Sequence, residues 1–305
     1  MRSFYTLPLR VISHNIRYAT TSPFKGEELW PVRAPRLLSE LRFHTTYNQE
    51  SFICMQEVLH SQLVNILTGL NNDTSRNASY IEVDPAPQSD EWTYIGVGRD
   101  DGKQAGEYSP IFYRPAIWQL EHSKSIWLSE TPDVPSKGWD AASIRILTVG
   151  RFRHRASRRQ VLMLCTHLDD QGAVSRQKSA ELITTFVRDY LHQYGNATEL
   201  PVILAGDFNS EPTEEAYQYL NGPSSLLRDT RERIPPERRY GNENTFTGFS
   251  EEDGPPKRID FIFAGPLDNA TFNVTATKGY AVLSNRFDDG VYISDHRAVV
   301  GDFVL

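Results

Sequence analysis

Val202-Ile-Leu-Ala-Gly-Asp-Phe-Asn-Ser210 is an apolar run that stops abruptly at a glycine, an aspartate and an asparagine. An apolar run of about this length fits a strand that is buried on both faces, and Gly206 lets the backbone turn where the run ends. Asp207 and Asn209 stand two positions apart, so their side chains project toward the same side of the sheet edge. Both can bind a metal ion or a phosphate group. Because Asp and Asn also end strands as ordinary turn formers, this motif alone leaves both interpretations open.

Other strand-like runs of the chain end on side chains of the same kind. Asn15 ends the run 9–15, Glu57 ends 51–57, His167 ends 161–167, Asp260 lies inside 258–263, and Ser294-Asp-His296 precedes 298–305. Each run alone could be a capped strand without function. Their repetition favours one shared site, at which the strand ends meet and bring Asp, Glu, Asn and His side chains together.

The motifs that carry these residues resemble, in the same order, those of the endonuclease/exonuclease/phosphatase superfamily. This group includes DNase I-like nucleases, abasic-site endonucleases, sphingomyelinases and inositol-phosphate phosphatases. The motifs are His14-Asn15, Gln56-Glu57, Thr166-His-Leu168, Gly206-Asp-Phe-Asn209, Arg258-Ile-Asp-Phe-Ile-Phe263 and Ser294-Asp-His296. The resemblance covers nearly the whole chain. It implies an enzyme that hydrolyses phosphate esters, and it specifies the reaction far better than the substrate.

The resemblance also implies the fold. This is an α/β (α+β) four-layer sandwich, in which two mostly antiparallel β-sheets pack face to face and helices cover the outer faces. The sequence pattern is consistent with it, because one-sided helical patterns at about 30–41, 60–70, 175–192 and 212–220 separate short apolar runs. The motifs lie near both ends of the sequence and no composition shift marks a boundary, so we expect a single domain over residues 1–305.

The superfamily's metal-binding residue corresponds to Glu57. The resemblance implies that Glu57 binds Mg²⁺ or Mn²⁺ with Asn15 and Asp295 close by, and Ca²⁺ is a further hard ion that such oxygen ligands suit. The spacing of the two cysteines excludes a zinc site of the paired-cysteine kind. A bound metal would therefore be held by oxygen.

The remaining motif residues are implied to act on the phosphate and the attacking water. Asp207 resembles the residue that positions or deprotonates the water, and Asn209 and His167 resemble the donors to phosphate oxygens. Asp260 would fix the tautomer of His296 and stabilise its protonated form, so that this imidazole can donate to phosphate. Whether Asp207 or His296 accepts the proton stays open.

A predicted β-hairpin in the first third of the chain supplies candidate substrate contacts. Arg99 offers a planar guanidinium suited to a phosphate or a sugar diol, and Glu107 precedes the returning strand. The segment that follows is similar to one with which the superfamily places an aromatic or basic residue over the phosphate. Tyr113 and Arg114 are both candidates, because strand alternation turns one inward and the other outward. An exposed hairpin tip without function is the alternative.

Further candidate contacts follow in a loop rich in Pro and Trp over residues 125–140. Trp139 and Asp140 could bind the leaving group, with a sugar ring stacked on the indole, or Trp139 could simply pack the loop down. Arg145 lies in an apolar run, where it needs a partner; a structural ion pair and a substrate contact both fit. The segment 245–249 is similar to the aromatic-and-Thr segment that lines the superfamily's phosphate pocket.

Composition restricts the partners. The chain has 305 residues, and 32 basic against 39 acidic side chains give a net charge of −7. This balance does not favour binding to DNA or anionic membranes, although bound cations would offset part of it locally. The basic run 151–159 is the one candidate for nucleic-acid contact, and it also fits a solvated hairpin tip.

No apolar run approaches the length of about eighteen residues that crosses a bilayer. We expect a monomer.

The cysteines and the Asn-x-Ser/Thr sequons bear on location. Cys54 and Cys165 lie in strand-like runs, where buried free thiols are favoured over a cross-strand disulfide. The sequence begins without a signal peptide. Five sequons nevertheless favour secretion, with a leader that this sequence lacks, over a cytoplasmic location. Their asparagines are Asn72, Asn77, Asn196, Asn269 and Asn273.

These observations favour hydrolysis of a small or sugar-containing phosphodiester. A nuclease, or a phosphomonoesterase such as a sugar or inositol phosphatase, would use the same machinery on another substrate. A non-catalytic binding module is the alternative from a different class. It would have lost a metal-binding or water-activating residue, and no motif here lacks one.

Overall fold

The computed structural model of the protein describes residues 6–72, 91–194, 200–266 and 276–305. Four of the sequon asparagines, Asn77, Asn196, Asn269 and Asn273, lie outside these ranges, whereas Asn72 is exposed. Within these ranges, no helix combines the length and the apolar character that a membrane span requires.

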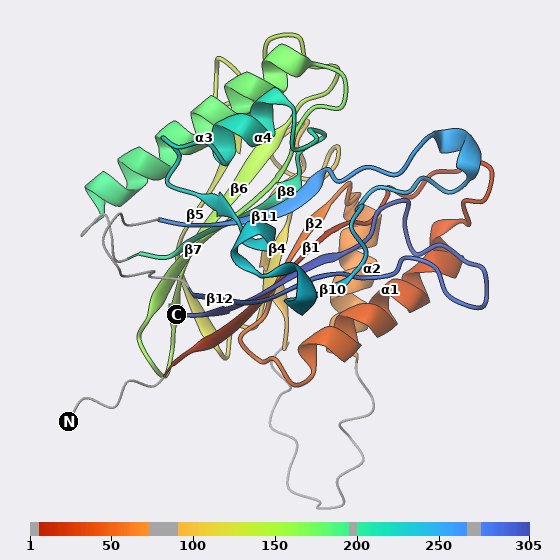
Figure 1. Ribbon diagram of the computed structural model, residues 1–305, viewed down its shortest axis with the longest axis horizontal. Helices are drawn as coiled ribbons and strands as arrows, with labels where there is room; N and C mark the ends of the chain where they lie inside the picture. Colours follow the sequence, from red (N-terminus) through yellow and green to blue (C-terminus); the bar gives the residue numbers. More distant parts are fainter. Residues whose placement is uncertain (1–5, 73–90, 195–199, 267–275) are drawn as a thin grey trace, which may run out of the picture.

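Two β-sheets packed face to face form the centre of the protein (Figure 1). Their strands are β1 (Pro8–Asn15), β2 (Phe52–Gln56), β3 (Thr93–Ile95), β4 (Ile111–Tyr113), β5 (Trp118–Trp127), β6 (Ile146–His154), β7 (Gln160–His167), β8 (Val202–Asp207), β9 (Arg228–Asp229), β10 (Arg239–Gly241), β11 (Asp260–Gly265), β12 (Ala276–Val282) and β13 (Val299–Val304). One sheet has the order β10-β12-β13-β1-β2-β4-β3 and the other β5-β6-β7-β8-β11-β9. The pairs β1–β2, β10–β12 and β7–β8 are parallel and the others antiparallel, which confirms two mostly antiparallel sheets.

Helices cover the outer face of each sheet, as the four-layer prediction requires (Figure 1). The α-helices are α1 (Trp30–Thr45), α2 (His60–Asn71), α3 (Ala173–Gln193) and α4 (Glu215–Leu220), and the short 3₁₀ helices are η2 (Thr230–Arg233), η3 (Pro236–Arg238) and η4 (Glu251–Asp253). α1 and α2 pack on the β1–β2 side, and α3 and α4 on the β7–β8 side. All four predicted helical patterns are present, although α1 continues to Thr45 and α4 begins only at Glu215.

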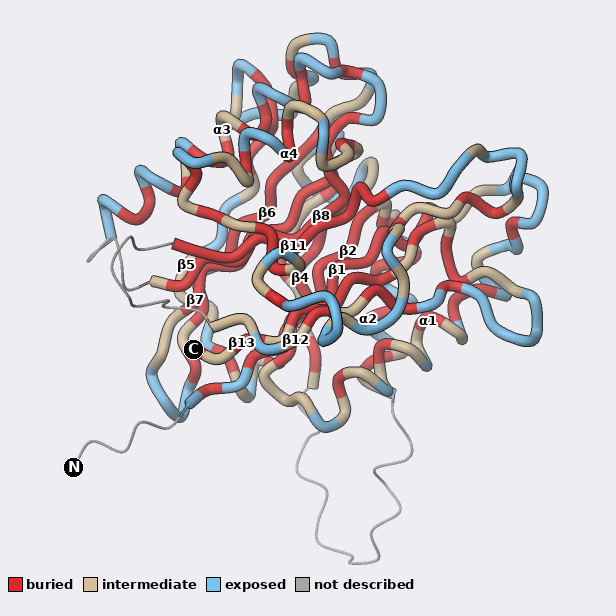
Figure 2. The backbone as a smooth tube through the Cα atoms, in the orientation of Figure 1, coloured by how far each residue is buried: buried red, intermediate tan, exposed pale blue. Residues whose placement is uncertain are grey.

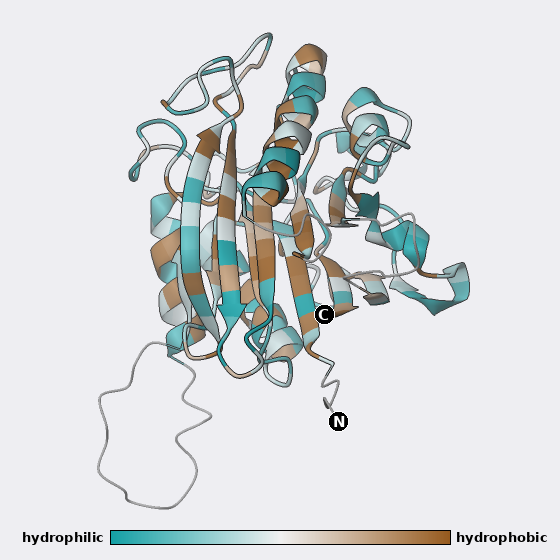
Figure 3. Cartoon of the chain, turned by 90° about the vertical axis from the view of Figure 1, so that its left-hand side faces the viewer, coloured by the Kyte–Doolittle hydropathy of each residue, from teal (hydrophilic) through white to brown (hydrophobic). Residues whose placement is uncertain are grey.

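The alternation of side chains along β8 explains why its sequence is apolar throughout. Val202 and Leu204 share a core cluster with α3 and α4, whereas Ile203 and Ala205 share one with the opposite sheet. Figure 2 shows the central strands buried and the surrounding loops exposed. In Figure 3 the strands are correspondingly apolar along most of their length. A strand covered on both faces has no polar side, so the alternating pattern of a half-exposed strand is absent.

Strand β5 has no counterpart in the sequence prediction. It forms an edge of its sheet, and most of its central residues are exposed or half-buried, so its sequence lacks a buried apolar pattern. Its last three positions were predicted to be loop, and the loop begins only after Trp127. Conversely, β6 begins at Ile146, so Arg145 stands just before the strand rather than inside it.

Strand register brings the motif residues to one edge of the sandwich. β7 runs parallel to β8, with His167 opposite Asp207, and β11 runs antiparallel to β8, with Asp260 opposite Asp207. In the other sheet, the parallel strands β1 and β2 end together at Asn15 and Gln56. The expected convergence of the strand ends is therefore observed.

Both cysteines lie between the two sheets. Cys54 on β2 and Cys165 on β7 are free thiols with 0% exposure, which confirms the favoured alternative. Burial raises the pKa of the Cys54 thiol well above its usual value, and the hydrogen bond with Cys165 raises it further.

We expect neither thiol of the native protein to react with dithionitrobenzoate, because the reagent requires an accessible thiolate. Once guanidinium chloride unfolds the chain, absorbance should report two thiols per chain. The Cys54→Ala variant should then release one equivalent, as a control for the count. Rapid reaction before unfolding would contradict the described packing.

Candidate active site

The strand ends surround a pocket of about 380 Å³. Its walls include nine of the predicted site residues, namely Glu57, Arg99, Glu107, Arg145, His167, Asp207, Asn209, Asp295 and His296. A larger pocket of about 580 Å³ lies between α1 and β10, and none of the motif residues lines it. Chemistry therefore identifies the site, and cavity size does not.

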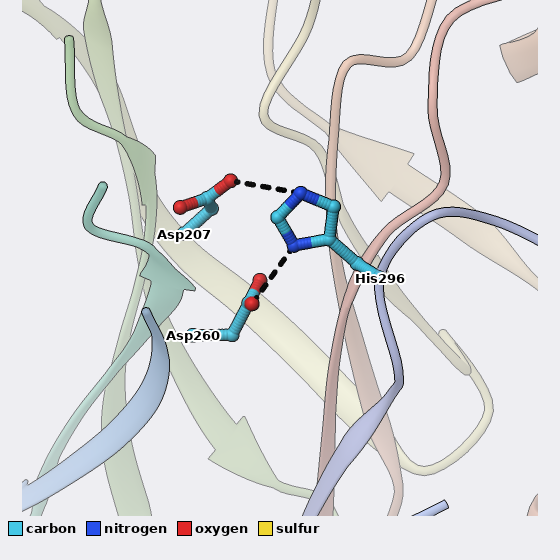
Figure 4. Close-up of side chains that lie close together, drawn as sticks. All are labelled: Asp207, Asp260 and His296. Atoms are coloured by element: carbon cyan, nitrogen blue, oxygen red, sulfur yellow. Dashed lines mark hydrogen bonds and ion pairs between the residues drawn. The ribbon is translucent and has the colours of Figure 1, made fainter. Parts of the chain in front are cut away.

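His296 lies between two buried carboxylates (Figure 4). Its Nδ1 is 2.9 Å from Asp260 Oδ2, and its Nε2 is 3.6 Å from Asp207 Oδ2. The hydroxyl of Thr245 accepts a hydrogen bond from the backbone N–H of Asp260, and the ring of Phe246 packs edge-on against the imidazole. The Nδ1 proton is thereby directed to Asp260, and Nε2 faces the pocket.

Neighbouring charges set the protonation of these groups. Burial lowers the pKa of His296, but the charges of Asp260 and Asp207 outweigh this effect and place the pKa well above its usual range. Burial raises the pKa of Asp207 to about 7, and the charge of Asp260 acts in the same direction. Near neutral pH, a protonated imidazole therefore lies beside a carboxyl group that readily gains or loses a proton.

Asp207 accepts hydrogen bonds from both sheets. The side-chain amide of Asn15 lies 2.9 Å from Asp207 Oδ2, and the backbone N–H of Asn209 lies 2.9 Å from Asp207 Oδ1. His167 Nε2 is 3.5 Å from Oδ2. The side-chain nitrogen Nδ2 of Asn209 donates to the carbonyl of Leu168, at 3.0 Å, and lies 3.1 Å from His167 Nε2. His167 Nε2 is therefore an acceptor, and its ring proton resides on Nδ1.

His167 belongs to a second group of coupled charges. Burial lowers its pKa well below the usual value, and the positive charges of Arg145 and Arg99 lower it further, so the imidazole is neutral. Its Nδ1 is 3.9 Å from Glu107, which accepts a hydrogen bond from Arg99 at 2.8 Å. Burial raises the pKa of Glu107 to about 7, and the charge of Glu57 acts in the same direction. Arg99, Glu107 and Arg145 all line the pocket.

Glu57 and Asp295 form the part of the pocket that fits a divalent cation. Burial raises the pKa of Asp295, and the charge of Glu57 raises it further. Two carboxylates held together at a largely buried position repel each other, and a hard metal ion between them would relieve this repulsion. Asn15 donates to Glu57 at 3.0 Å, while its own oxygen accepts from the backbone N–H of Arg17. Asn15 therefore bridges Glu57 and Asp207 through its amide nitrogen, and its oxygen keeps one lone pair that Arg17 does not use.

Asp207, Asp260 and His296 form a second set of candidate metal ligands, with donor atoms within 4.8 Å of one another. The oxygen Oδ2 of Asp260, however, accepts the Nδ1 proton of His296. Ions such as Mg²⁺ prefer oxygen ligands over imidazole. The carboxylates of Glu57 and Asp295 are the better match for such an ion.

Backbone strain is concentrated at the site. Arg17, Glu57 and Asn209 have left-handed backbone conformations, with φ of 55°, 60° and 46°. The buried guanidinium of Arg33 stabilises the segment after β1 by donating to several backbone carbonyls, including those of Ile16, Arg17, Tyr18 and Ile293. These contacts tie the segment after Asn15 to the one that leads into Asp295.

Arg145 has the ion-pair partners that its buried position requires. Its Nε is 3.2 Å from Asp169 Oδ2 and its Nη2 is 2.7 Å from Asp170 Oδ1. Burial raises the pKa of Asp169, but backbone N–H donors and Arg145 outweigh this effect and bring the pKa to about 2. Those backbone donors belong to Ala142, Ser143, Gln171 and Gly172. Arg145 makes a structural pair, which confirms that alternative, and it also lines the pocket, where a substrate contact stays a prediction.

The structure places the segment with Tyr113 and Arg114 away from the pocket, which corrects both candidates. Tyr113 turns into the core between the sheets, where it packs against Phe152. Arg114 turns to the other face and donates to Glu91 and to several backbone carbonyls, with its guanidinium over the ring of Trp92. Both side chains are occupied by packing.

Trp139 and Asp140 are not among the residues that line the pocket either. Asp140 accepts hydrogen bonds from the backbone N–H groups of Val174 and Ser175 in the first turn of α3. Its carboxylate therefore stabilises the positive end of that helix. The backbone N–H of Trp139 donates to Glu130, within the same loop. The predicted leaving-group contact of Asp140 is corrected to a structural one, and the indole of Trp139 does not line the pocket.

Several pocket residues were not predicted from the sequence. They are Arg17, Tyr18, Ser143, Asp170, Lys257 and Ile259. Arg17 and Tyr18 directly follow the Asn15 motif, and Asp170 follows the His167 motif. Proximity to a motif was the available signal, whereas nothing in the local sequence pointed to Ser143.

Residues 12–296 match the Endonuclease/Exonuclease/phosphatase family. The chain belongs to this family. Its members are phosphoric ester hydrolases that use divalent metals, so the resemblance recognised in the motifs is confirmed at the level of reaction class.

Individual members of the family differ in their substrates. A mannosyl-6-phosphatase from Bacteroides thetaiotaomicron is 31% identical, with a TM-score of 0.78 and coverage of 97% of this chain and 100% of that one. Nocturnin from Drosophila melanogaster is 27% identical over 85% of this chain, which spans only 40% of that protein's length. D. rerio TDP2 complexed with single strand DNA product, at 18% identity, coverage of 97% and 98% and a TM-score of 0.62, shares the fold alone.

We expect the affinity for Mg²⁺ or Mn²⁺ to weaken as the pH falls. Asp295 has a raised pKa, so a proton competes with the cation there at a higher pH than at an ordinary aspartate. Below that pKa, the dissociation constant should rise by up to about tenfold per pH unit for one displaced proton. Isothermal titration calorimetry in buffers of different ionisation enthalpy measures both the affinity and the proton release. An affinity that stays constant as the pH is lowered through the range in which carboxylates gain protons would contradict the proposed ligand set.

Proposed function

We propose that this protein hydrolyses phosphate esters of sugars or other small polar alcohols in a reaction that depends on a divalent metal. The observation that carries the proposal is the pairing of a protonated His296 with a titratable Asp207 on one pocket, opposite Glu57 and Asp295. A proton donor, a proton acceptor and a cation site within one small cavity are the elements that hydrolysis of a phosphate ester requires.

In the proposed mechanism, Asp207 accepts the proton of the attacking water. Its pKa of about 7 makes it a stronger base than an ordinary carboxylate, while the raised pKa of His296 makes that imidazole a donor. His296 Nε2 donates to a phosphoryl oxygen, and Asp260 holds the ring through Nδ1. His167 lines the same pocket, and its buried Nδ1 lies 3.9 Å from Glu107. Asn209 positions His167 through its amide.

We propose Mg²⁺ or Mn²⁺ as the metal, held by Glu57 and Asp295. Few protein ligands suit these ions, which retain several waters, whereas Ca²⁺ takes more oxygen ligands than this pair supplies. The bound ion would act as a Lewis acid on a phosphoryl oxygen and on the leaving oxygen. Arg17, which lies beside both carboxylates, would limit their mutual repulsion before the ion binds.

The position of the basic run 151–159 weighs against a nuclease. β6 and β7 pair Leu147 with Thr166 near the site and Arg153 with Gln160 near their connection. The run therefore lies at the end of the hairpin remote from His167. A nucleic-acid substrate would need its basic residues around the pocket. A nuclease is the alternative that the sequence left open.

Ester type, assembly and location are further proposals. From the sequence, the acidic net charge favoured a small phosphodiester as substrate. The similarity to a mannosyl-6-phosphatase instead favours a phosphate monoester of a sugar. We propose a monomer that is secreted, and the exposed Asn72 is an accessible glycosylation site for that case.

The Asp207→Ala and His296→Ala variants should each have a turnover at least about a hundredfold lower, because each substitution removes a proton-transfer group. Initial rates with an activated ester and excess Mg²⁺ measure the loss, and circular dichroism checks the fold. Asp133→Ala, at a side chain that is 75% exposed and remote from the pocket, is the matched control. Near-normal rates in either variant would refute the assigned roles.

The proposed function itself is tested with p-nitrophenyl phosphate, bis(p-nitrophenyl) phosphate, a hexose 6-phosphate and supercoiled plasmid, each with Mg²⁺, Mn²⁺ or EDTA. We expect metal-dependent hydrolysis of the small esters and an intact plasmid. Preference between the first two compounds separates monoesterase from diesterase. Nicking of the plasmid would instead identify a nuclease. Absence of hydrolysis with every ester would refute the proposed function.

A further inference from the structure

We propose that Asp170, Arg145 and Ser143 recognise hydroxyl groups of the leaving alcohol, so that the pocket selects polyhydroxylated esters such as sugar phosphates. This inference rests on the proposed hydrolase function and adds a part of the pocket that selects the substrate. The three residues form one part of the pocket wall, which we call the polar wall.

The polar wall is held in place by a buried carboxylate behind it. Asp169 is 0% exposed and accepts the backbone N–H of Ser143 and one N–H of Arg145. Further backbone donors from the segments on either side of it complete its hydrogen bonds. Asp169 thereby orients the two wall residues before a substrate arrives, which reduces the ordering cost of binding.

Asp170 has the geometry of a ligand-binding carboxylate rather than a buried structural one. Its side chain is 47% exposed, whereas that of its partner Arg145 is 5% exposed. One carboxylate oxygen accepts from Arg145 at 2.7 Å, and the other accepts from Gln171 at 2.8 Å. Each oxygen has a second lone pair, so both can accept further hydrogen bonds from the pocket side.

The charges of the polar wall favour a neutral ligand. Arg145 is balanced by Asp169 and Asp170, and its neighbour Arg99 is paired with Glu107. A nucleic-acid backbone binds to uncompensated positive charge, which this wall does not offer. A hydroxyl group, by contrast, donates one hydrogen bond and accepts others. Adjacent guanidinium N–H and carboxylate oxygen atoms match neighbouring hydroxyls of a sugar ring.

Hydrogen bonding at the polar wall would then orient the ring on this side of the pocket. Trp139, the aromatic residue expected from the sequence to stack on a sugar, does not line the pocket. A site whose polar groups pair with substrate hydroxyls discriminates against analogues that lack them, because these hydrogen bonds are then lost. An aromatic leaving group without hydroxyls makes none of these contacts.

The test compares kcat/KM for a hexose 6-phosphate and for p-nitrophenyl phosphate in Asp170→Asn and Asp170→Ala, with Mg²⁺. The ratio of the two kcat/KM values should fall by at least about tenfold in both variants, mainly through KM for the sugar ester. Asp133→Asn, at an exposed carboxylate outside the pocket, should leave the ratio unchanged. A thermal unfolding scan of each variant identifies any general loss of stability.

Hexose 6-phosphates that each lack one hydroxyl provide a second readout. In the wild-type enzyme, loss of a contacted hydroxyl should lower kcat/KM, and the same loss should have little effect in Asp170→Asn, because the two changes remove one interaction. A purely structural role of Asp170 would leave the two effects additive.

The possible results separate the two proposals. An unchanged ratio with additive effects, or a wild-type enzyme that hydrolyses p-nitrophenyl phosphate but no sugar phosphate, would overturn the polar wall and leave the hydrolase function standing. Absence of metal-dependent hydrolysis with every ester would overturn the hydrolase function and the inference that rests on it.

Discussion

A buried hydrogen bond from the Asn15 amide to Asp207 connects the two sheets at the edge where the site lies. Asn15 ends β1 of one sheet and Asp207 ends β8 of the other, so this contact fixes the relative position of the two strand ends. The same amide donates to Glu57, which joins the candidate cation site to the candidate proton acceptor. Because the interaction is shielded from water, loss of either partner would leave a buried polar group unpaired.

The pocket combines two histidines whose pKa values are shifted in opposite directions. Burial alone would keep both Asp207 and His296 neutral, but Asp260 stabilises the imidazolium and discourages a second negative charge on Asp207. His167, at the end of β7, is kept neutral by burial and by nearby arginines. The two histidines of the site thus hold different charges, because carboxylates raise the pKa of His296, whereas burial and guanidinium groups lower the pKa of His167. Such contrasts are what divide acid and base roles among like residues.

The sequence was sufficient for residues that lie within a motif at the end of an apolar strand. His167, Asp207 and His296 were found in this way, and strand register then accounts for their meeting. Side-chain direction was not accessible for Tyr113 and Arg114, because β4 is buried on both faces and apolar residues surround both candidates. The role of Asp169 depends on backbone N–H groups from two separate segments, which no local pattern encodes. β5 was not predicted for a similar reason. As a largely exposed edge strand it is defined by its hydrogen bonds to β6, and its own sequence has no buried apolar pattern.

The left-handed backbone at Glu57 and Asn209 has a consequence for how this protein responds to selection. A non-glycine residue in that conformation costs about 1 kcal/mol of folding free energy, and less for Asn, which tolerates it better; glycine would largely remove this cost. Directed evolution for heat resistance alone would therefore favour glycine at these two positions, and it would delete a carboxylate and an amide on which the proposed chemistry depends. The larger side chains there are the places where the proposed chemistry and stability make opposite demands on the sequence.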